Sequence, residues 1–237
     1  MVRQERAVRT RQAILVAAGE VFDEVGYEAA TIAEILRRSG VTKGALYFHF
    51  SSKAELAQGV LDEQVNALPV VPRGELCLQR SLDEALLLAF LLRGDGGDAI
   101  VRGSVRLTVD QGAPRDGLDR RLPMQGWERH TLGVLEEARA AGELLAHVDL
   151  VRVTKVLVGG MTGVQVLSNI MTGRRDMPER VADLYRHVLP SVAVPAVLAQ
   201  MDFSPERAGR VYEEAVGARG RAGEGSRSGG LASAVSG

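Results

Sequence analysis

Hydrophobic residues recur three or four positions apart along most of this chain, which is the spacing of an α-helix with one buried face. Stripes of this kind run through residues 14–22, 56–61, 80–93, 99–111, 127–142, 149–172, 176–189 and 204–216. Thr31 followed by Glu34, and Ser52 followed by Glu55, are capping-box patterns that indicate helix starts. Gly40 follows a periodic stretch and is typical of a helix end. The pattern predicts an all-α protein.

Two of these predicted helices lie close together in residues 31–53, TIAEILRRSGVTKGALYFHFSSK. The first ends at Gly40, Val41 is an apolar turn residue, and Thr42 is the N-cap of a second, short helix. Two helices joined by a tight turn that contains glycine form a helix-turn-helix. In that motif, the N-terminal residues of the second helix meet base edges in the major groove of DNA.

The side chains of this second helix suit DNA. Lys43 is long enough to reach guanine, and small side chains at Gly44 and Ala45 let the backbone approach the groove floor. The polar tips of Tyr47 and His49 can bond phosphate oxygens. The candidate DNA-binding residues of the motif are Thr42, Lys43, Gly44, Ala45, Tyr47, His49 and Lys53. The remaining large side chains, Leu46, Phe48 and Phe50, are expected in the core.

A basic arm precedes the first helix stripe and includes Arg3 and Arg6. Such an arm can reach the DNA backbone or the minor groove. An ordinary solvated helix start explains the same residues equally well. Both interpretations stay open for Arg3 and Arg6.

The segment GVTKGALYFHFSSKAEL resembles the second half of the DNA-binding domain of TetR-type transcriptional regulators, and VTKGALYFHF is most similar to their γ-butyrolactone-receptor branch. The resemblance is strong over the first fifty-odd residues and covers the rest in outline. It implies an all-α, TetR-like homodimer. Its expected parts are a three-helix DNA-binding domain over 1–55 and a ligand-binding and dimerisation domain over 56–216. The Gly, Ser, Ala and Arg composition of residues 217–237 predicts a disordered tail.

The candidate ligand-binding residues are Gln64 and Trp127, which the resemblance implies, and Thr162 and Gln165, which the residue pattern itself suggests. Gln64 lies where the family places a polar residue towards the ligand, although a plain exposed amide is the alternative. A lone tryptophan is usually core, but the family places one against the ligand at the position of Trp127. Thr162 and Gln165 offer polar atoms on an apolar helix. The Thr162 hydroxyl either bonds ligand oxygen or returns to the backbone four residues earlier.

Three glycines interrupt the middle of the apolar stretch 149–172: Gly159, Gly160 and Gly163. Each costs about 1 kcal/mol of helix stability relative to alanine. Their presence indicates that a neighbouring helix or a ligand approaches closely. In the TetR-type family, the last two long helices form a four-helix dimer interface.

Composition and charge exclude several kinds of site but do not by themselves identify the function. The net charge is −1, and residues 1–55 hold eight basic against seven acidic side chains, so DNA binding must depend on local charge. Cys77 is the only cysteine, which excludes an intrachain disulfide and a cysteine-based metal cluster. The charged N-terminus and the short LLLAFLL run predict neither a signal peptide nor a membrane span. The chain is expected to be cytoplasmic, without metal or cofactor.

An enzyme is the rival class. The four histidines are scattered, and no metalloprotease or nucleophile-elbow motif accompanies them, so no catalytic residue is predicted. The resemblance to TetR-type regulators instead implies a repressor of secondary-metabolite genes that leaves a palindromic double-stranded DNA operator when it binds a γ-butyrolactone or butenolide. A relative that senses an antibiotic, a repressor that acts without a ligand, and an architectural DNA binder remain alternatives.

Overall fold

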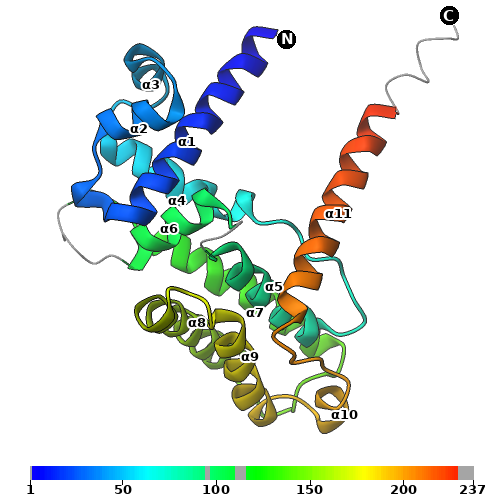
Figure 1. The fold of residues 1–237 in the computed structure, drawn as a ribbon. Coiled ribbons are helices and arrows are strands. Elements are labelled where there is room, and N and C mark those ends of the chain that lie inside the picture. Colours follow the sequence, from blue (N-terminus) through cyan, green and yellow to red (C-terminus); the bar gives the residue numbers. More distant parts are fainter. Residues whose placement is uncertain (1, 94–96, 110–115, 229–237) are drawn as a thin grey trace, which may run out of the picture. The chain divides into compact units, whose positions relative to one another are not determined.

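The computed structural model describes the backbone of residues 2–93, 97–109 and 116–228, and their side chains except at 2, 3, 65, 66 and 219–228. Helices dominate these ranges, which contain one isolated β-bridge, between Leu144 and Ala193, and no strand (Figure 1). The all-α prediction is therefore confirmed. The helices are α1 (Val2–Ala29), α2 (Ile32–Ser39), α3 (Lys43–His49), α4 (Lys53–Ala67), α5 (Cys77–Leu91), α6 (Ala99–Val109), α7 (Arg121–Ala140), α8 (Leu150–Thr172), α9 (Met177–Val188), a 3₁₀ turn (Leu189–Ser191), α10 (Pro195–Leu198) and α11 (Arg207–Ser228).

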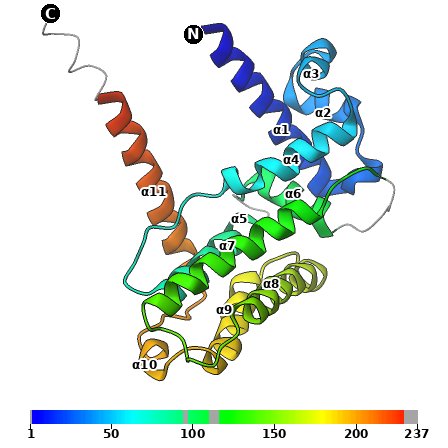
Figure 2. The ribbon, with the colours of Figure 1, turned by 180° about the vertical axis from the view of Figure 1, so that it is seen from behind.

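The chain divides into two compact units, and the division differs from the boundary expected after residue 55. The first unit contains residues 1–68 and 91–127, and the second contains residues 69–90 and 128–237. Helices α4 and α6 join the first unit because both pack against α1 (Figure 2). Their inward side chains, such as Leu56 and Ile100, share one hydrophobic core with Phe22 of α1 and Leu46 of α3.

The contact between α1 and α6 depends on two glycines. A Cβ atom at Gly19 would lie 2.5 Å from the Ala99 carbonyl oxygen, and one at Gly103 would lie 2.5 Å from the Gly19 carbonyl oxygen. Any larger side chain would therefore push the two backbones apart. Gly26, where α1 bends, has φ 73° and separates the main helix from a last short turn before Ala29.

Helix α7 begins earlier than the sequence predicted, at Arg121 rather than near Trp127. Pro123 lies in the first turn of this helix. Proline is tolerated there because the first amide groups of a helix have no partner within it.

In the second unit, α8 packs against α9, and Gly160 accounts for part of this contact. A Cβ atom at Gly160 would lie 2.7 Å from a methyl carbon of Leu184, so the expected close approach of a neighbouring helix is present here. Added Cβ atoms at Gly159 and Gly163 would meet nothing within 4 Å. Those two glycines are therefore not explained by packing within the described chain.

The junction between α8 and α9 is held by one carboxylate. Ser168 and Thr172 donate hydroxyl hydrogen bonds to Asp176 Oδ1 at 2.6 and 2.7 Å, and Arg180 Nε donates to Asp176 Oδ2 at 2.7 Å. The Ser168 hydrogen bond, with those from Thr172 and Arg180, lowers the pKa of Asp176 to about 2. Gly173 ends α8 in the left-handed conformation, with φ 62°.

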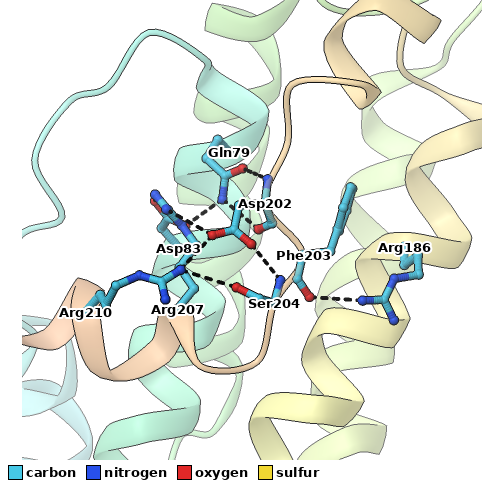
Figure 3. Close-up of polar contacts among 8 residues, drawn as sticks. All are labelled: Gln79, Asp83, Arg186, Asp202, Phe203, Ser204, Arg207 and Arg210. Carbon is cyan, nitrogen blue, oxygen red and sulfur yellow. Dashed lines mark hydrogen bonds and ion pairs between the residues drawn. The ribbon is translucent and has the colours of Figure 1, made fainter.

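Helix α11 is fastened to α5 by a polar network (Figure 3). The Arg207 guanidinium donates to both carboxylate oxygens of Asp83, at 2.5 and 2.7 Å. Gln79 donates to Asp83 and accepts from the Asp202 backbone amide, each at 2.8 Å. Tyr212 also stacks on Phe90, with ring centroids 4.5 Å apart.

The same helix extends further than the sequence predicted. A short helix over 204–216 and a disordered tail from 217 were expected, but the backbone is helical as far as Ser228. Residues 229–237 of the predicted tail lie outside the described residues.

Candidate nucleic-acid interface

Local hydrogen bonds set the bounds of α2 and α3 as the sequence predicted. The Thr31 hydroxyl oxygen accepts the Glu34 amide at 3.2 Å, and the Thr42 hydroxyl oxygen accepts the Ala45 amide at 3.2 Å. Between the two helices, Gly40 adopts the left-handed conformation with φ 66° and donates its amide to Leu36 O. The two helices and this turn form the predicted helix-turn-helix, which lies beside α1 (Figure 1).

Arg38 ties α2 to α1 through carboxylates. Its guanidinium donates to Glu24 at 2.7 and 2.6 Å and to Glu34 at 2.8 Å. Hydrogen bonds from Arg37 and from Arg38 hold the pKa of Glu34 at about 2. Glu34 thus bonds the arginines of its own helix, whereas a complete capping box would direct it back to Thr31.

The outer face of α3 presents most of the predicted DNA-binding side chains. Thr42, Lys43, Gly44 and Tyr47 are exposed, while Ala45 and His49 are partly exposed. Lys43 Nζ lies 5.9 Å from the centre of the Tyr47 ring, one helical turn away. An added Cβ atom at Gly44 would meet no protein atom within 4 Å, so this glycine is not required by packing within the described chain. The arrangement leaves cationic, hydroxyl and small side chains open on one surface.

Phe48 is not a core residue, and that prediction was wrong. Leu46 and Phe50 are buried as expected, but the Phe48 side chain is 80% exposed. The three residues alternate along the sequence, and two residues on a helix are separated by roughly 200° around the axis. Phe48 therefore points away from the core that Leu46 and Phe50 enter. A helical projection of α3 would have identified this exposed aromatic residue from the sequence.

The Lys53 ammonium, predicted to contact phosphate, is already bonded within the protein. It donates to the carbonyl oxygens of Tyr27, Glu28 and Ala30 at 2.9, 3.3 and 3.1 Å, and it lies 4.4 Å from the centre of the Tyr27 ring. An ammonium has three N–H donors, and three acceptors surround this one. The geometry gives Lys53 a structural role at the end of α1.

The basic arm is only partly described. Arg6 lies on α1 with an exposed side chain, and the side chain of Arg3 lies outside the described residues. A role in DNA binding stays a prediction for both.

Two of the four predicted ligand residues, Gln64 on α4 and Trp127 on α7, belong to the first unit. Gln64 is only 2% exposed, and its side-chain oxygen has no hydrogen-bond partner. This burial argues against the plain exposed amide. Trp127 is partly exposed, so it is not a fully buried core residue.

The other two, Thr162 and Gln165, lie partly exposed on α8 in the second unit. The Thr162 hydroxyl donates to Val158 O at 2.9 Å, as the backbone alternative predicted. Its oxygen keeps a free capacity to accept. Sequence reasoning missed Thr154 of α8, whose hydroxyl is buried without a hydrogen-bond partner. Within the described residues, no three His, Cys, Asp or Glu side chains are grouped to hold a metal ion.

Comparison with known proteins agrees with this geometry. Residues 14–60, which contain α2 and α3, match the family described as bacterial regulatory proteins, tetR family. The A-factor receptor protein of Streptomyces griseus is 39% identical over 204 residues, which are 85% of this chain and 70% of that protein.

Solved structures share the fold over most of the chain. TylP, a TetR regulator from Streptomyces fradiae, is 60% identical, with a TM-score of 0.82 over 89% of this chain and 99% of that one. A γ-butyrolactone receptor described as an ArpA-like protein is 28% identical, with a TM-score of 0.66 over 88% of this chain and 99% of that one. The chain therefore belongs to the TetR family of bacterial regulatory proteins, and its relatives include the γ-butyrolactone receptors.

Proposed function

We propose that this protein is a homodimeric transcriptional repressor that binds a palindromic DNA operator and leaves it when a γ-butyrolactone or butenolide binds. The exposed outer face of α3 supports the DNA-binding part. Lys43, Gly44 and Tyr47 lie open there, at the helix that a helix-turn-helix protein inserts into the major groove. This assignment puts the protein in the cytoplasm, where the operator DNA lies, and it requires no catalytic step.

The single observation that carries the ligand-binding part is the unpaired oxygen of Gln64. A buried amide oxygen without a partner costs about 1–3 kcal/mol, so such groups call for an explanation. A ligand hydroxyl that donates to Gln64 Oε1 supplies the missing hydrogen bond. Trp127, in the same unit, offers a flat apolar wall for an alkyl chain or a lactone ring.

The position of Gln64 also suggests how a ligand reaches the DNA-binding helix. Gln64 lies on α4, which is separated from the end of α3 by three residues. Gln58 of the same helix accepts the Asp119 amide at 3.1 Å, so α4 is tied to the segment that leads into α7 and Trp127. A ligand that moves α4 therefore moves the C-terminal end of the helix-turn-helix, where α3 leads into α4. It releases DNA only if it binds the DNA-incompetent state more tightly.

The apolar face of α8 supports the homodimer. Six large apolar side chains of this helix are exposed: Val151, Val156, Val166, Leu167, Ile170 and Met171. Helix α8 is also long and apolar enough to cross a membrane by length and composition alone, with 17% of that stretch buried. We infer that α8 of a second copy packs against this apolar face in the dimer. Gly159 and Gly163 leave room for such a helix to approach closely.

A fluorescence-anisotropy titration tests the proposal. Wild-type protein is titrated onto a palindromic duplex selected from a random pool, with and without a panel of γ-butyrolactones and butenolides. We expect tight binding that one compound abolishes. Gln64→Leu should bind the duplex like wild type, unfold at an equal or higher temperature because the unpaired oxygen is gone, and need more ligand for release.

Each other outcome has a distinct meaning. Tight binding that no compound of the panel releases would replace the butyrolactone assignment with one of the alternatives, an antibiotic sensor or a ligand-independent repressor, and would leave the DNA-binding part unchanged. Failure to select any duplex would contradict the repressor itself.

A further inference from the structure

Phe48 is the most unusual side chain on the DNA-facing surface. No large apolar side chain in the described part of the chain is more exposed, and the rest of the α3 face is polar or small. A phenylalanine offers about 150–250 Å² of surface, and leaving it in water gives up the stabilisation that burial would bring. An apolar partner outside the chain would explain its position.

The neighbours of Phe48 leave it open towards such a partner. Gly44 lies one helical turn before it and has no side chain to cover the ring. The His49 imidazole meets the ring in an edge-on contact, with centroids 5.1 Å apart and planes at 82°. Lys43 and Tyr47 lie close to each other on the same helix, and their polar groups are suited to contacts with phosphates and base edges. Phe48 therefore occupies the part of the α3 surface opposite the buried Leu46 and Phe50.

The major groove presents one apolar group, the C5-methyl group of thymine, and apolar side chains recognise thymine through it. We propose that Phe48 reads a thymine in each half-site of the operator by packing against this methyl group. The inference rests on the proposed DNA-binding function and adds a residue that selects sequence. Cytosine and uracil lack the methyl group, so both should be disfavoured at that position.

Replacement of thymine by uracil tests the contact one methyl group at a time. Each thymine of a selected palindromic duplex is replaced by deoxyuridine in both half-sites, and affinity is measured by fluorescence anisotropy at fixed salt. At one position we expect a loss of about fourfold per half-site, the factor for burying one methyl group, or roughly 16-fold for the duplex. Phe48→Ala should bind the unmodified duplex at least that much more weakly and should no longer distinguish uracil from thymine there.

Two further variants make the result specific. Phe48→Leu keeps an apolar side chain and should keep part of the uracil sensitivity. Val25→Ala removes an exposed apolar side chain of α1 and should behave as wild type. Because Phe48 is exposed, thermal unfolding of Phe48→Ala should match that of wild type, which separates a lost contact from a lost fold.

Three results would overturn the inference. The first is tight wild-type binding that no uracil substitution weakens. The second is uracil sensitivity that Phe48→Ala retains, since another side chain would then hold the methyl group. The third is failure to bind any selected duplex, which would remove the proposed function together with this inference.

Discussion

Two lysines of the DNA-binding unit show that a residue's charge does not decide its role. Lys43 stands exposed on α3, and its described contact is the ring of Tyr47. Lys53 lies only ten residues later, but its three donors point at the carbonyl oxygens that end α1. Free carbonyl groups at a helix end attract a cation, and this attraction competes with any phosphate. The sequence cannot reveal that competition, because Tyr27 is 26 residues away.

Stability and operator affinity separate the two lysines, and the salt dependence of binding tests whether Lys53 contacts phosphate. Each phosphate contact releases counterions, so its loss reduces the slope of log K against log salt by about 0.9. Lys53→Ala should keep the wild-type slope and lower the free energy of unfolding by about 1.5–3 kcal/mol, the usual range for hydrogen bonds to a charged group. Lys43→Ala should keep the stability, weaken operator binding by about 1–3 kcal/mol and relax base preference. Anisotropy at several salt concentrations and thermal unfolding measure both effects. A reduced slope for Lys53→Ala would restore its predicted phosphate contact.

At the scale of helices, the sequence predicts what is local and misses what is distant. The caps at Thr31, Thr42 and Ser52 locate α2, α3 and α4 to within a residue or two, because each cap bonds an amide three residues away. The assignment of α6 to the DNA-binding unit was not predictable in this way. It depends on Gly19 and Gly103, which are 84 positions apart in the sequence. Their missing side chains matter only in the folded chain, where the backbones of α1 and α6 come into contact.

The crossing of α1 and α6 should be sensitive to one methyl group. Gly19→Ala would place a Cβ atom 2.5 Å from the Ala99 carbonyl oxygen, which is far closer than van der Waals contact, so the two backbones must separate. We expect a loss of about 1–3 kcal/mol in the free energy of unfolding, even though alanine favours the helix itself. Gly133→Ala in α7 is the matched control, because a Cβ atom there meets nothing within 4 Å and should stabilise the protein by up to about 1 kcal/mol. Equal stabilisation by both substitutions in chemical denaturation would contradict the tight crossing.

The junction of α8 and α9 should depend on pH through Asp176. Its folded-state pKa of about 2 lies below the ordinary value of 3.8, because Ser168, Thr172 and Arg180 donate to the charged form. This contribution to stability is complete above about pH 4.5 and is lost as the pH falls through about 2. Asp176→Asn should therefore be less stable than wild type at neutral pH, with the difference shrinking towards pH 2. A difference in unfolding free energy that stays constant from pH 7 to pH 2 would argue against the charged junction.

At the scale of the whole molecule, the predicted ligand residues are divided between the two units. Gln64 and Trp127 belong to the unit that carries α3, whereas Thr162 and Gln165 belong to the unit that carries α8. The resemblance to TetR-type regulators indicated Gln64 and Trp127, although a lone tryptophan is usually a core residue, whereas Thr162 and Gln165 were chosen as polar side chains on an apolar helix. Burial of Gln64 without a partner for its oxygen was visible only in the folded chain, since it depends on everything that surrounds α4.

The proposed homodimer gives the last prediction, because one palindrome needs two recognition helices. Ile170 is 70% exposed on the apolar face of α8, and Val70, in the loop before α5, is 80% exposed. Ile170→Asp should weaken dimerisation by at least about 3 kcal/mol, more than 100-fold in the dissociation constant, because each copy would bury an unpaired charge. Val70→Asp adds the same charge and should remain a dimer.

Sedimentation equilibrium at micromolar concentration measures the assembly state, and circular dichroism checks the fold. A monomeric Ile170→Asp that keeps its helices should also bind a half-site duplex and a full palindrome with similar affinity, since its two heads are no longer joined. If Ile170→Asp stayed a dimer with wild-type operator affinity, the interface would have to lie on another surface. The exposed residues of α8 and the open glycines Gly159 and Gly163 would then need a different partner.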